Sequence, residues 1–231
     1  MEDIRENLRK VRSKIEKAAE GAGRSPDEIT LVGICKVQPI EKIQAAVDAG
    51  LVHLGENRVQ EAAAKIPQIK GNAHWRLVGH LQSNKAKKAV ELFDVIESID
   101  SERLAEEVSR RCVEAGKTMD VLLEVNVGGE EAKTGVEPSG LMDLARFCAR
   151  LEGLSVKGIM VIPPFGPDPE TSRPYFQRSR RLFEELKDAG IAGLDIRHLS
   201  MGMSSDFEVA IEEGATIVRV GTAIFGQRQY D

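Results

Sequence analysis

Residues Thr30–Val37 read TLVGICKV, and this stretch decides the fold class of the 231-residue chain. The run is apolar almost throughout instead of alternating, which indicates a strand that is buried on both faces and therefore lies in a parallel sheet. An open dinucleotide-binding sheet would need a glycine fingerprint after its first strand, and Cys35–Pro39 reads CKVQP. The stretch therefore favours a closed barrel over an open doubly wound sheet.

Seven further runs of this kind follow, and amphipathic helical patterns separate them. The eight predicted strands are Thr30–Val37, Leu51–Gly55, Trp75–Leu81, Val95–Ile99, Val121–Val127, Val156–Ile162, Ile196–Ser200 and Ile217–Phe225. The predicted helices between them lie near residues 40–49, 57–66, 84–92, 101–115, 138–151, 172–189 and 205–213. Eight parallel strands, each followed by a helix or by the chain end, close most simply into a (β/α)₈ TIM barrel of the α/β class.

An amphipathic helix precedes the first strand. Ile4, Leu8, Val11 and Ile15 recur at spacings of four and three, and glycines at 21 and 23 end the pattern. Ser25–Glu28 reads SPDE, which predicts a capping box at a short helical turn, and Ser205–Glu208, which reads SDFE, predicts another. The chain shows no linker or repeat, so we expect residues 1–231 to form a single domain, with 1–22 as a helix packed on the barrel.

Composition excludes several classes of protein. The net charge of −5 argues against a nucleic-acid binder, which needs a basic face. No run approaches the ~18 apolar residues of a membrane span, and no signal peptide opens the chain. Three widely spaced cysteines fit a reducing compartment, so we expect a cytoplasmic protein. The four histidines show no ligand spacing, so no metal site is expected.

Reactive groups of such barrels cluster at the carboxyl ends of the strands, and Lys36 ends the first one. Desolvation in an apolar run lowers the pKa of a lysine and leaves a nucleophilic amine, which Schiff-base chemistry requires. The alternative is a lysine at a strand end that extends to solvent. Asn57 and His80 follow the second and third strands, where each could line a pocket mouth; alternatively, Asn57 could cap the next helix.

Arg219 lies inside the eighth run and needs a partner, because an unpaired buried charge is not tolerated. The partner could be a carboxylate, or a nitrogen or phosphate group of a ligand.

An anion site is expected after the last two strands, where phosphate sites of this fold are usually built. Gly202 and Gly221 would let the backbone approach the anion, and Ser200 and Thr222 would donate hydroxyl groups. The alternative is that these are ordinary turn and cap residues.

Over nearly its whole length, the chain resembles the pyridoxal phosphate homeostasis protein family, a barrel similar to the amino-terminal domain of bacterial alanine racemases. The motifs that carry the resemblance are Leu31–Val37, His53–Asn57, Gly79–Lys85, Val125–Val127, Gly158–Met160, His198–Ser204 and Arg219–Gly226.

The resemblance implies a set of cofactor contacts. Lys36 is expected to form a Schiff base with pyridoxal 5′-phosphate (PLP), and Arg219 to meet the pyridine nitrogen. Asn57 is expected near the cofactor ring. Ser200, Gly221 and Thr222 are expected to hold the phosphate, with the turn at Met201 and Gly202 closing round it.

An arginine beside the pyridine nitrogen disfavours its protonation and weakens the ring as an electron sink. Racemases also take one base from a second, β-rich domain, whereas this chain stops at Asp231. We therefore expect a monomeric PLP carrier or reservoir without strong catalytic activity, which supplies PLP-dependent enzymes. The alternatives are a PLP-dependent racemase or decarboxylase, a phosphosugar enzyme with a Schiff-base lysine, and a scaffold without cofactor.

Overall fold

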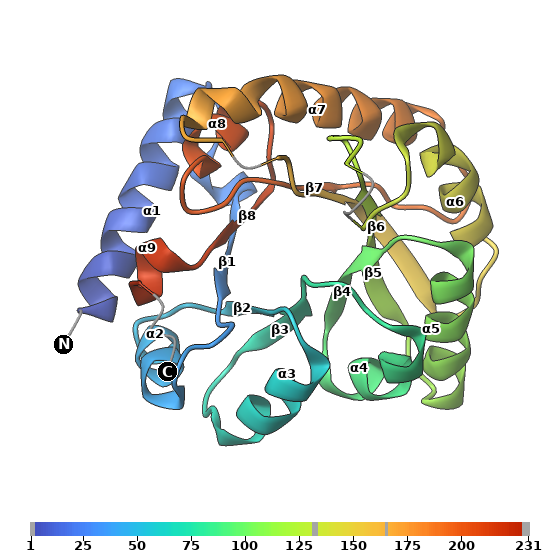
Figure 1. The fold of residues 1–231 in the computed structure, drawn as a ribbon, viewed down its shortest axis with the longest axis horizontal. Coiled ribbons are helices and arrows are strands. Elements are labelled where there is room, and N and C mark those ends of the chain that lie inside the picture. Colours follow the sequence, from blue (N-terminus) through green and yellow to red (C-terminus); the bar gives the residue numbers. More distant parts are fainter. Residues whose placement is uncertain (1–2, 131–133, 165, 228–231) are drawn as a thin grey trace.

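A closed barrel of eight parallel strands forms the centre of the protein in the computed structural model, which describes residues 3–130, 134–164 and 166–227. The strands run β1 to β8 in chain order around the barrel, and helices surround them (Figure 1). β8 closes the ring by pairing with β1, with Arg219 opposite Val32 and Val220 opposite Gly33. The (β/α)₈ fold predicted from the sequence is therefore confirmed.

The elements alternate as the sequence patterns indicate. The strands are β1 (Thr30–Ile34), β2 (His53–Glu56), β3 (His74–Leu77), β4 (Val95–Ile99), β5 (Met119–Val125), β6 (Leu154–Val161), β7 (His198–Ser200) and β8 (Ile217–Val220). The helices are α1 (Ile4–Gly21), α2 (Ile40–Asp48), α3 (Val59–Lys65), α4 (Ala86–Leu92), α5 (Glu102–Glu114), α6 (Leu141–Cys148), α7 (Arg173–Asp188), α8 (Phe207–Glu212) and α9 (Thr222–Phe225). The described residues also form the 3₁₀ turns η1 (Pro26–Glu28), η2 (Ile66–Gln68), η3 (Ser83–Lys85), η4 (Pro138–Gly140) and η5 (Pro169–Ser172).

Asp3 is the N-cap of helix α1, and its carboxylate accepts hydrogen bonds from the backbone N–H groups of Arg5 and Glu6. Its apolar stripe is buried and includes Leu8 and Val11. This stripe faces the barrel side, where α1 contacts α2, α8 and α9 (Figure 1). The capping box predicted at Ser25 and Glu28 is present.

The barrel interior is partly apolar and partly charged. Val32, Leu122, Met160 and Ile217 form one buried cluster. Because side chains two residues apart share a face of a strand, Arg219 points to the same side as Ile217. The Arg219 side chain therefore lies inside the barrel, and the residue is 3% exposed.

Several predictions about where elements end are wrong. β1 stops at Ile34 and β3 at Leu77, so Lys36 does not end the first strand as predicted but lies in the turn beyond it. β8 stops at Val220, so Gly221 and Thr222 lie just beyond the strand and begin α9. The predicted capping box at Ser205–Glu208 is absent, because Asp206 is the N-cap of α8 and makes no side-chain cap bond. The Asp206 carboxylate instead accepts hydrogen bonds from the Met203 N–H group and the Ser172 hydroxyl group.

The three cysteines are free and buried. Burial raises the pKa of the Cys148 thiol to about 12, so this thiol behaves as an apolar core group. Within residues 3–130, 134–164 and 166–227, no helix combines the length and apolar character that crossing a membrane requires. The same residues contain no group of three or more His, Cys, Asp or Glu side chains that could hold a metal ion.

Gly158 of β6 provides a test of the strand packing. A Cβ atom at this position would lie 1.8 Å from the carbonyl oxygen of His198 on β7. We therefore expect Gly158→Ala to lower the free energy of unfolding by roughly 2–4 kcal/mol in urea titrations. The control is Gly21→Ala at the end of α1, where nothing lies within 4 Å and stability should stay equal or rise. Equal stability of Gly158→Ala and the parent would contradict this register.

Candidate functional site

A cavity of about 560 Å³ opens at the carboxyl ends of the strands, and we call it the barrel-mouth cavity. This volume falls within the range of small-molecule sites. The cavity is lined by Ile34, Lys36, Asn57, Val78, Ile162, Met203, Ser204, Ser205, Arg219, Gly221 and Thr222. Five residues predicted from the sequence therefore come together here: Lys36, Asn57, Arg219, Gly221 and Thr222.

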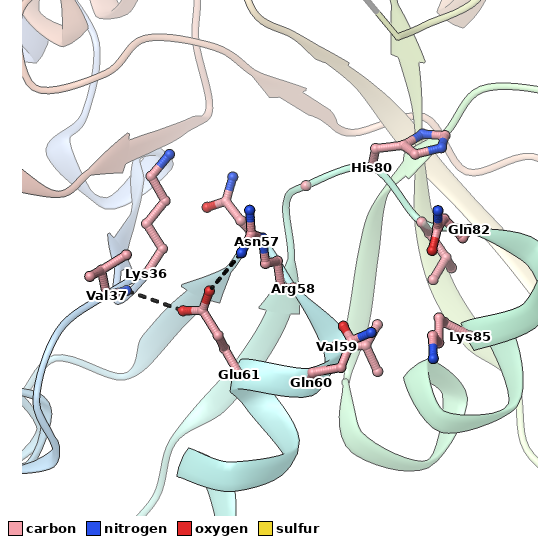
Figure 2. Close-up of a pocket in the computed structure, with 12 residues that line it drawn as sticks. Lys36, Val37, Asn57, Arg58, Val59, Gln60, Glu61, His80, Gln82 and Lys85 are labelled. Atoms are coloured by element: carbon pink, nitrogen blue, oxygen red, sulfur yellow. Dashed lines mark hydrogen bonds and ion pairs between the residues drawn. The ribbon is translucent and has the colours of Figure 1, made fainter. Parts of the chain in front are cut away.

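Lys36 lies in the turn that follows β1, two residues beyond the last strand residue Ile34, and it is half-buried. It also lines a second, larger space of about 970 Å³ between the β1, β2 and β3 ends, which we call the α3 groove. The groove is lined by Lys36, Val37, Asn57, Arg58, Val59, Gln60, Glu61, Gly79, His80, Leu81, Gln82 and Lys85. Figure 2 shows Lys36 and Asn57 on neighbouring strand ends, at the wall that both spaces share.

Asn57 follows β2 but does not cap the next helix, because Arg58 is the N-cap of α3. Its side-chain Oδ1 is buried and accepts no hydrogen bond from any described residue. A buried acceptor without a partner costs free energy. A ligand with a donor group in the cavity would satisfy this oxygen.

Arg219 is held by a chain of buried polar groups inside the barrel. Its NH1 donates to the Ser200 hydroxyl oxygen at 2.6 Å, and its NH2 donates to the Val161 carbonyl oxygen at 2.8 Å. The Ser200 hydroxyl group in turn donates to the Glu97 carboxylate at 2.7 Å. The sequence left open whether Arg219 meets a carboxylate or a ligand. In the structure, Ser200 links Arg219 to the Glu97 carboxylate, and Arg219 also lines the cavity.

Glu97 balances two guanidinium groups, because its other carboxylate oxygen accepts from Nε of Arg76. Burial alone would raise the pKa of Glu97. The charges of Arg76 and Arg219 and the Ser200 hydrogen bond outweigh burial and hold the pKa below its usual value. Glu97 is therefore ionised at neutral pH and keeps both guanidinium groups in place.

Part of the cavity lining carries hydroxyl groups. Ser204, Ser205, Gly221 and Thr222 line it, from the segments that follow β7 and β8. The Ser204 hydroxyl oxygen accepts a hydrogen bond from the Gly221 N–H group at 3.0 Å, which joins the two segments. Ser205 was missed as a site residue because the sequence pattern suggested a helix cap. Ser204 belongs to the segment expected to form the anion site but was not chosen as a contact.

Three predicted phosphate contacts do not line this cavity. Ser200 shares the inward face of β7 with His198, so its hydroxyl group bonds to Glu97 and Arg219 inside the barrel. Met201 is fully buried in the core. Gly202 has φ of 89° and packs against α8, where a Cβ atom would lie 2.5 Å from Ala210. Ser200, Met201 and Gly202 are therefore not among the residues found to line the cavity, and their predicted contacts with the phosphate stay predictions.

His80 and Asn126 also lie outside the barrel-mouth cavity. His80 lines the α3 groove, and its Nδ1 is 3.3 Å from the Asp100 carboxylate. The Asn126 side chain is bound to its own loop, since it donates to the Glu130 carbonyl and accepts from the Gly129 N–H group. The walls beside Lys36 and Arg219 are instead apolar, formed by Ile34, Val78, Ile162 and Met203, and suit a flat ring.

Comparison with known proteins adds independent evidence. Residues 1–229 match the family described as the N-terminal domain of alanine racemase. The chain is 46% identical over 227 residues to the pyridoxal phosphate homeostasis protein of Aquifex aeolicus, and the match covers 97% of this chain and 98% of that protein. The protein of the same name from Escherichia coli is 39% identical, with 100% and 99% covered.

Solved structures of other proteins share this fold. PipY of Synechococcus elongatus, solved with PLP bound, superposes with a TM-score of 0.85 at 38% identity, covering 96% of this chain and 100% of that one. An alanine racemase from Clostridium difficile has a TM-score of 0.76 at 16% identity, and the match covers 100% of this chain and 58% of that one. The racemase likeness shows a shared fold.

Glu97→Gln tests the buried charge network. The variant leaves two buried guanidinium groups without their carboxylate, so we expect the free energy of unfolding at pH 7 to fall by about 3–5 kcal/mol. Because the pKa of Glu97 is depressed in the folded protein, its contribution is present above the unfolded value near 4.3 and is lost as the pH falls through the folded pKa. Urea unfolding at pH 7 and at decreasing acidic pH measures both effects.

The matched control is Glu107→Gln on α5, whose carboxylate pairs with Arg110 and Arg111 at the surface. We expect this change to cost at most ~1 kcal/mol at neutral pH. A stability gap between Glu97→Gln and the parent that stays constant into acid would contradict the assigned charge of Glu97.

Proposed function

Since the chain belongs to the pyridoxal phosphate homeostasis proteins, within the family of the alanine racemase N-terminal domain, we propose that it binds PLP as a Schiff base on Lys36. In this proposal the protein acts as a carrier or reservoir in PLP homeostasis. The observation that carries it is the composition of the barrel-mouth cavity, which combines one amine, one buried guanidinium group and a cluster of hydroxyl groups between apolar walls.

These groups fit the chemistry of the cofactor. PLP supplies an aldehyde that condenses with amines and a pyridine ring that withdraws electrons. Lys36 would bind the aldehyde end, and Arg219 would donate to the pyridine nitrogen. Ser204, Ser205, Gly221 and Thr222 would hold the phosphate, with hydroxyl and backbone N–H groups as donors. The Oδ1 atom of Asn57, which lacks a partner among the described residues, would accept a hydrogen bond from the hydroxyl group of the PLP ring.

Arg219 also argues for storage over catalysis. Its guanidinium group stays charged because Glu97 lies one hydroxyl group away. A permanent cation beside the pyridine nitrogen opposes protonation of that nitrogen, which leaves the ring a weaker electron sink. Carbanion chemistry is then disfavoured, while Schiff-base formation and release are retained.

The second candidate function is a PLP-dependent racemase or decarboxylase. Such an enzyme needs an acid or base besides the lysine, placed at the α-carbon of the substrate. The residues found to line the barrel-mouth cavity include no Asp, Glu, His, Tyr or Cys. This composition, in the described part of the chain, supports the carrier function.

We further propose that the protein works as a monomer in the cytoplasm and passes PLP to PLP-dependent enzymes. The three buried free cysteines support a reducing compartment. An accessible Schiff-base lysine supports handover, because Lys36 also faces the open α3 groove through which an acceptor amine could approach.

Lys36→Ala tests the linkage. The parent protein incubated with PLP should show the absorbance band of a protein Schiff base, and borohydride should make the cofactor resistant to dialysis. Lys36→Ala should lose both signals, because no other amine lines the barrel-mouth cavity among its identified wall residues. Lys85→Ala, at the far side of the α3 groove, is the control that should retain them. Retention of the band by Lys36→Ala would refute the proposed linkage.

A second measurement separates carrier from enzyme. With PLP bound, the protein should exchange the α-hydrogen of common amino acids for deuterium far below typical turnover of about 1–10³ s⁻¹, because Arg219 weakens the electron sink. Proton NMR of amino acids in heavy water follows this exchange. Robust racemisation or decarboxylation of any amino acid would favour the enzyme instead.

A further inference from the structure

We propose that Glu61 and Lys65, one helical turn apart on α3, are positioning residues that clamp the backbone on both sides of Lys36. The clamp holds Val37 in a strained left-handed conformation and thereby fixes where the Lys36 amine stands. This inference rests on the proposed function, since it concerns the same lysine. It adds Glu61, Lys65 and the left-handed backbone conformation of Val37 to the site, none of which the sequence indicated.

Lys65 holds the peptide group that precedes Lys36. Its ammonium group donates to the Cys35 carbonyl oxygen at 2.8 Å and to the Glu56 carboxylate at 2.7 Å. The Lys65 side chain is 12% exposed and that of Glu56 is fully buried. Both groups therefore have few alternative partners, and the carbonyl before Lys36 is tied to a fixed cation.

Glu61 holds the peptide group that follows Lys36. Its Oε2 accepts a hydrogen bond from the Val37 N–H group at 3.2 Å (Figure 2). The same oxygen lies 3.5 Å from the Lys65 ammonium group. The two α3 side chains thus reach the residues on either side of Lys36 and contact each other. Both bonds are made to backbone atoms of the neighbours of Lys36, Cys35 and Val37, and not to the Lys36 side chain.

Val37 shows what the clamp has to overcome. Among the residues that the structure describes, Val37 alone combines a side chain with a positive φ, of 61°. This region is unfavourable for any residue with a Cβ atom and worst for branched ones. The Val37 side chain is 49% exposed, so burial does not offset the strain. The backbone bonds around the turn, including Gln38 N–H to the Cys35 carbonyl, must hold the conformation.

Loss of the clamp would change the direction in which the Lys36 side chain points. When φ of Val37 relaxes to a negative value, the peptide group between Lys36 and Val37 rotates and the lysine stem moves relative to Asn57 and Arg219. The strain of a left-handed residue corresponds to about a tenfold change in population or more. The Lys36 amine would then face the barrel-mouth cavity in a minority of molecules.

The experiment compares Glu61→Ala, Glu61→Gln and the double variant Glu61→Ala/Val37→Gly. Two quantities are measured: hydrogen exchange of the residue-37 amide by NMR in PLP-free protein, and the rate of PLP release into a semicarbazide trap. Glu61→Ala should raise both by about tenfold or more. Glu61→Gln should stay near the parent, because its amide oxygen can still accept from the Val37 N–H group.

Glycine at position 37 should restore slow PLP release in the double variant, because glycine takes a positive φ without strain. Rescue separates a backbone clamp from direct contact between Glu61 and the ligand, which Val37→Gly cannot replace. Failure of the rescue, or unchanged amide exchange in Glu61→Ala, would overturn the inference. Glu107→Ala on α5, with a carboxylate of similar exposure and also ion-paired, should change neither quantity.

The design keeps this inference separate from the proposed function. If the parent protein forms no Schiff base with PLP, the proposed function fails, while amide exchange at residue 37 still decides whether the clamp exists. If the parent binds PLP through Lys36 and Glu61→Ala releases it at the parent rate, the clamp fails and the function stands.

Discussion

The parallel pairing of β8 with β1 is the contact on which the site depends. Val32 lies opposite Arg219 and Gly33 opposite Val220, so the first and last strands end at the same rim. Lys36 follows one of these strands and Gly221 follows the other. An amine from near the start of the chain and a hydroxyl- and amide-rich segment from near its end therefore face one cavity only when the barrel is closed.

A buried charge accompanies this closure. Arg219 is inside the barrel because it shares a strand face with Ile217, and a guanidinium group there requires compensation. Glu97 provides it for Arg219 through Ser200 and for Arg76 directly. The same network that makes the interior tolerable also fixes a permanent cation at the cavity. Stability of the fold and the electronic character of the site are thus set by the same residues.

Much of this arrangement could be predicted from the sequence, because strand runs and helical spacing report burial directly. Lys36, Asn57, Gly221 and Thr222 follow strand ends and Arg219 lies in β8, and all five line the barrel-mouth cavity. Their contacts with a cofactor stay predictions. Sequence reasoning did not resolve the segment after β7. Ser200 is the last residue of β7 and its hydroxyl group bonds to Glu97 inside the barrel, whereas Ser204 lies beyond the strand and accepts from the Gly221 N–H group.

The clamp at Val37 could not be foreseen for the same reason. A valine with positive φ contradicts its local preference, and only the packing of α3 beside the β1 turn brings Glu61 and Lys65 to the peptide groups that stabilise it. Val37 adopts a backbone conformation that valine disfavours, and it does so next to Lys36. Strained backbone of this kind is typically found at functional sites.

The site of covalent attachment tests the central claim most directly. Peptide mapping by mass spectrometry after borohydride reduction of the PLP-loaded protein locates the modified lysine. The account predicts one phosphopyridoxyl group per chain, on the peptide that contains Lys36. Label spread over several surface lysines, or confined to a peptide without Lys36, would contradict it.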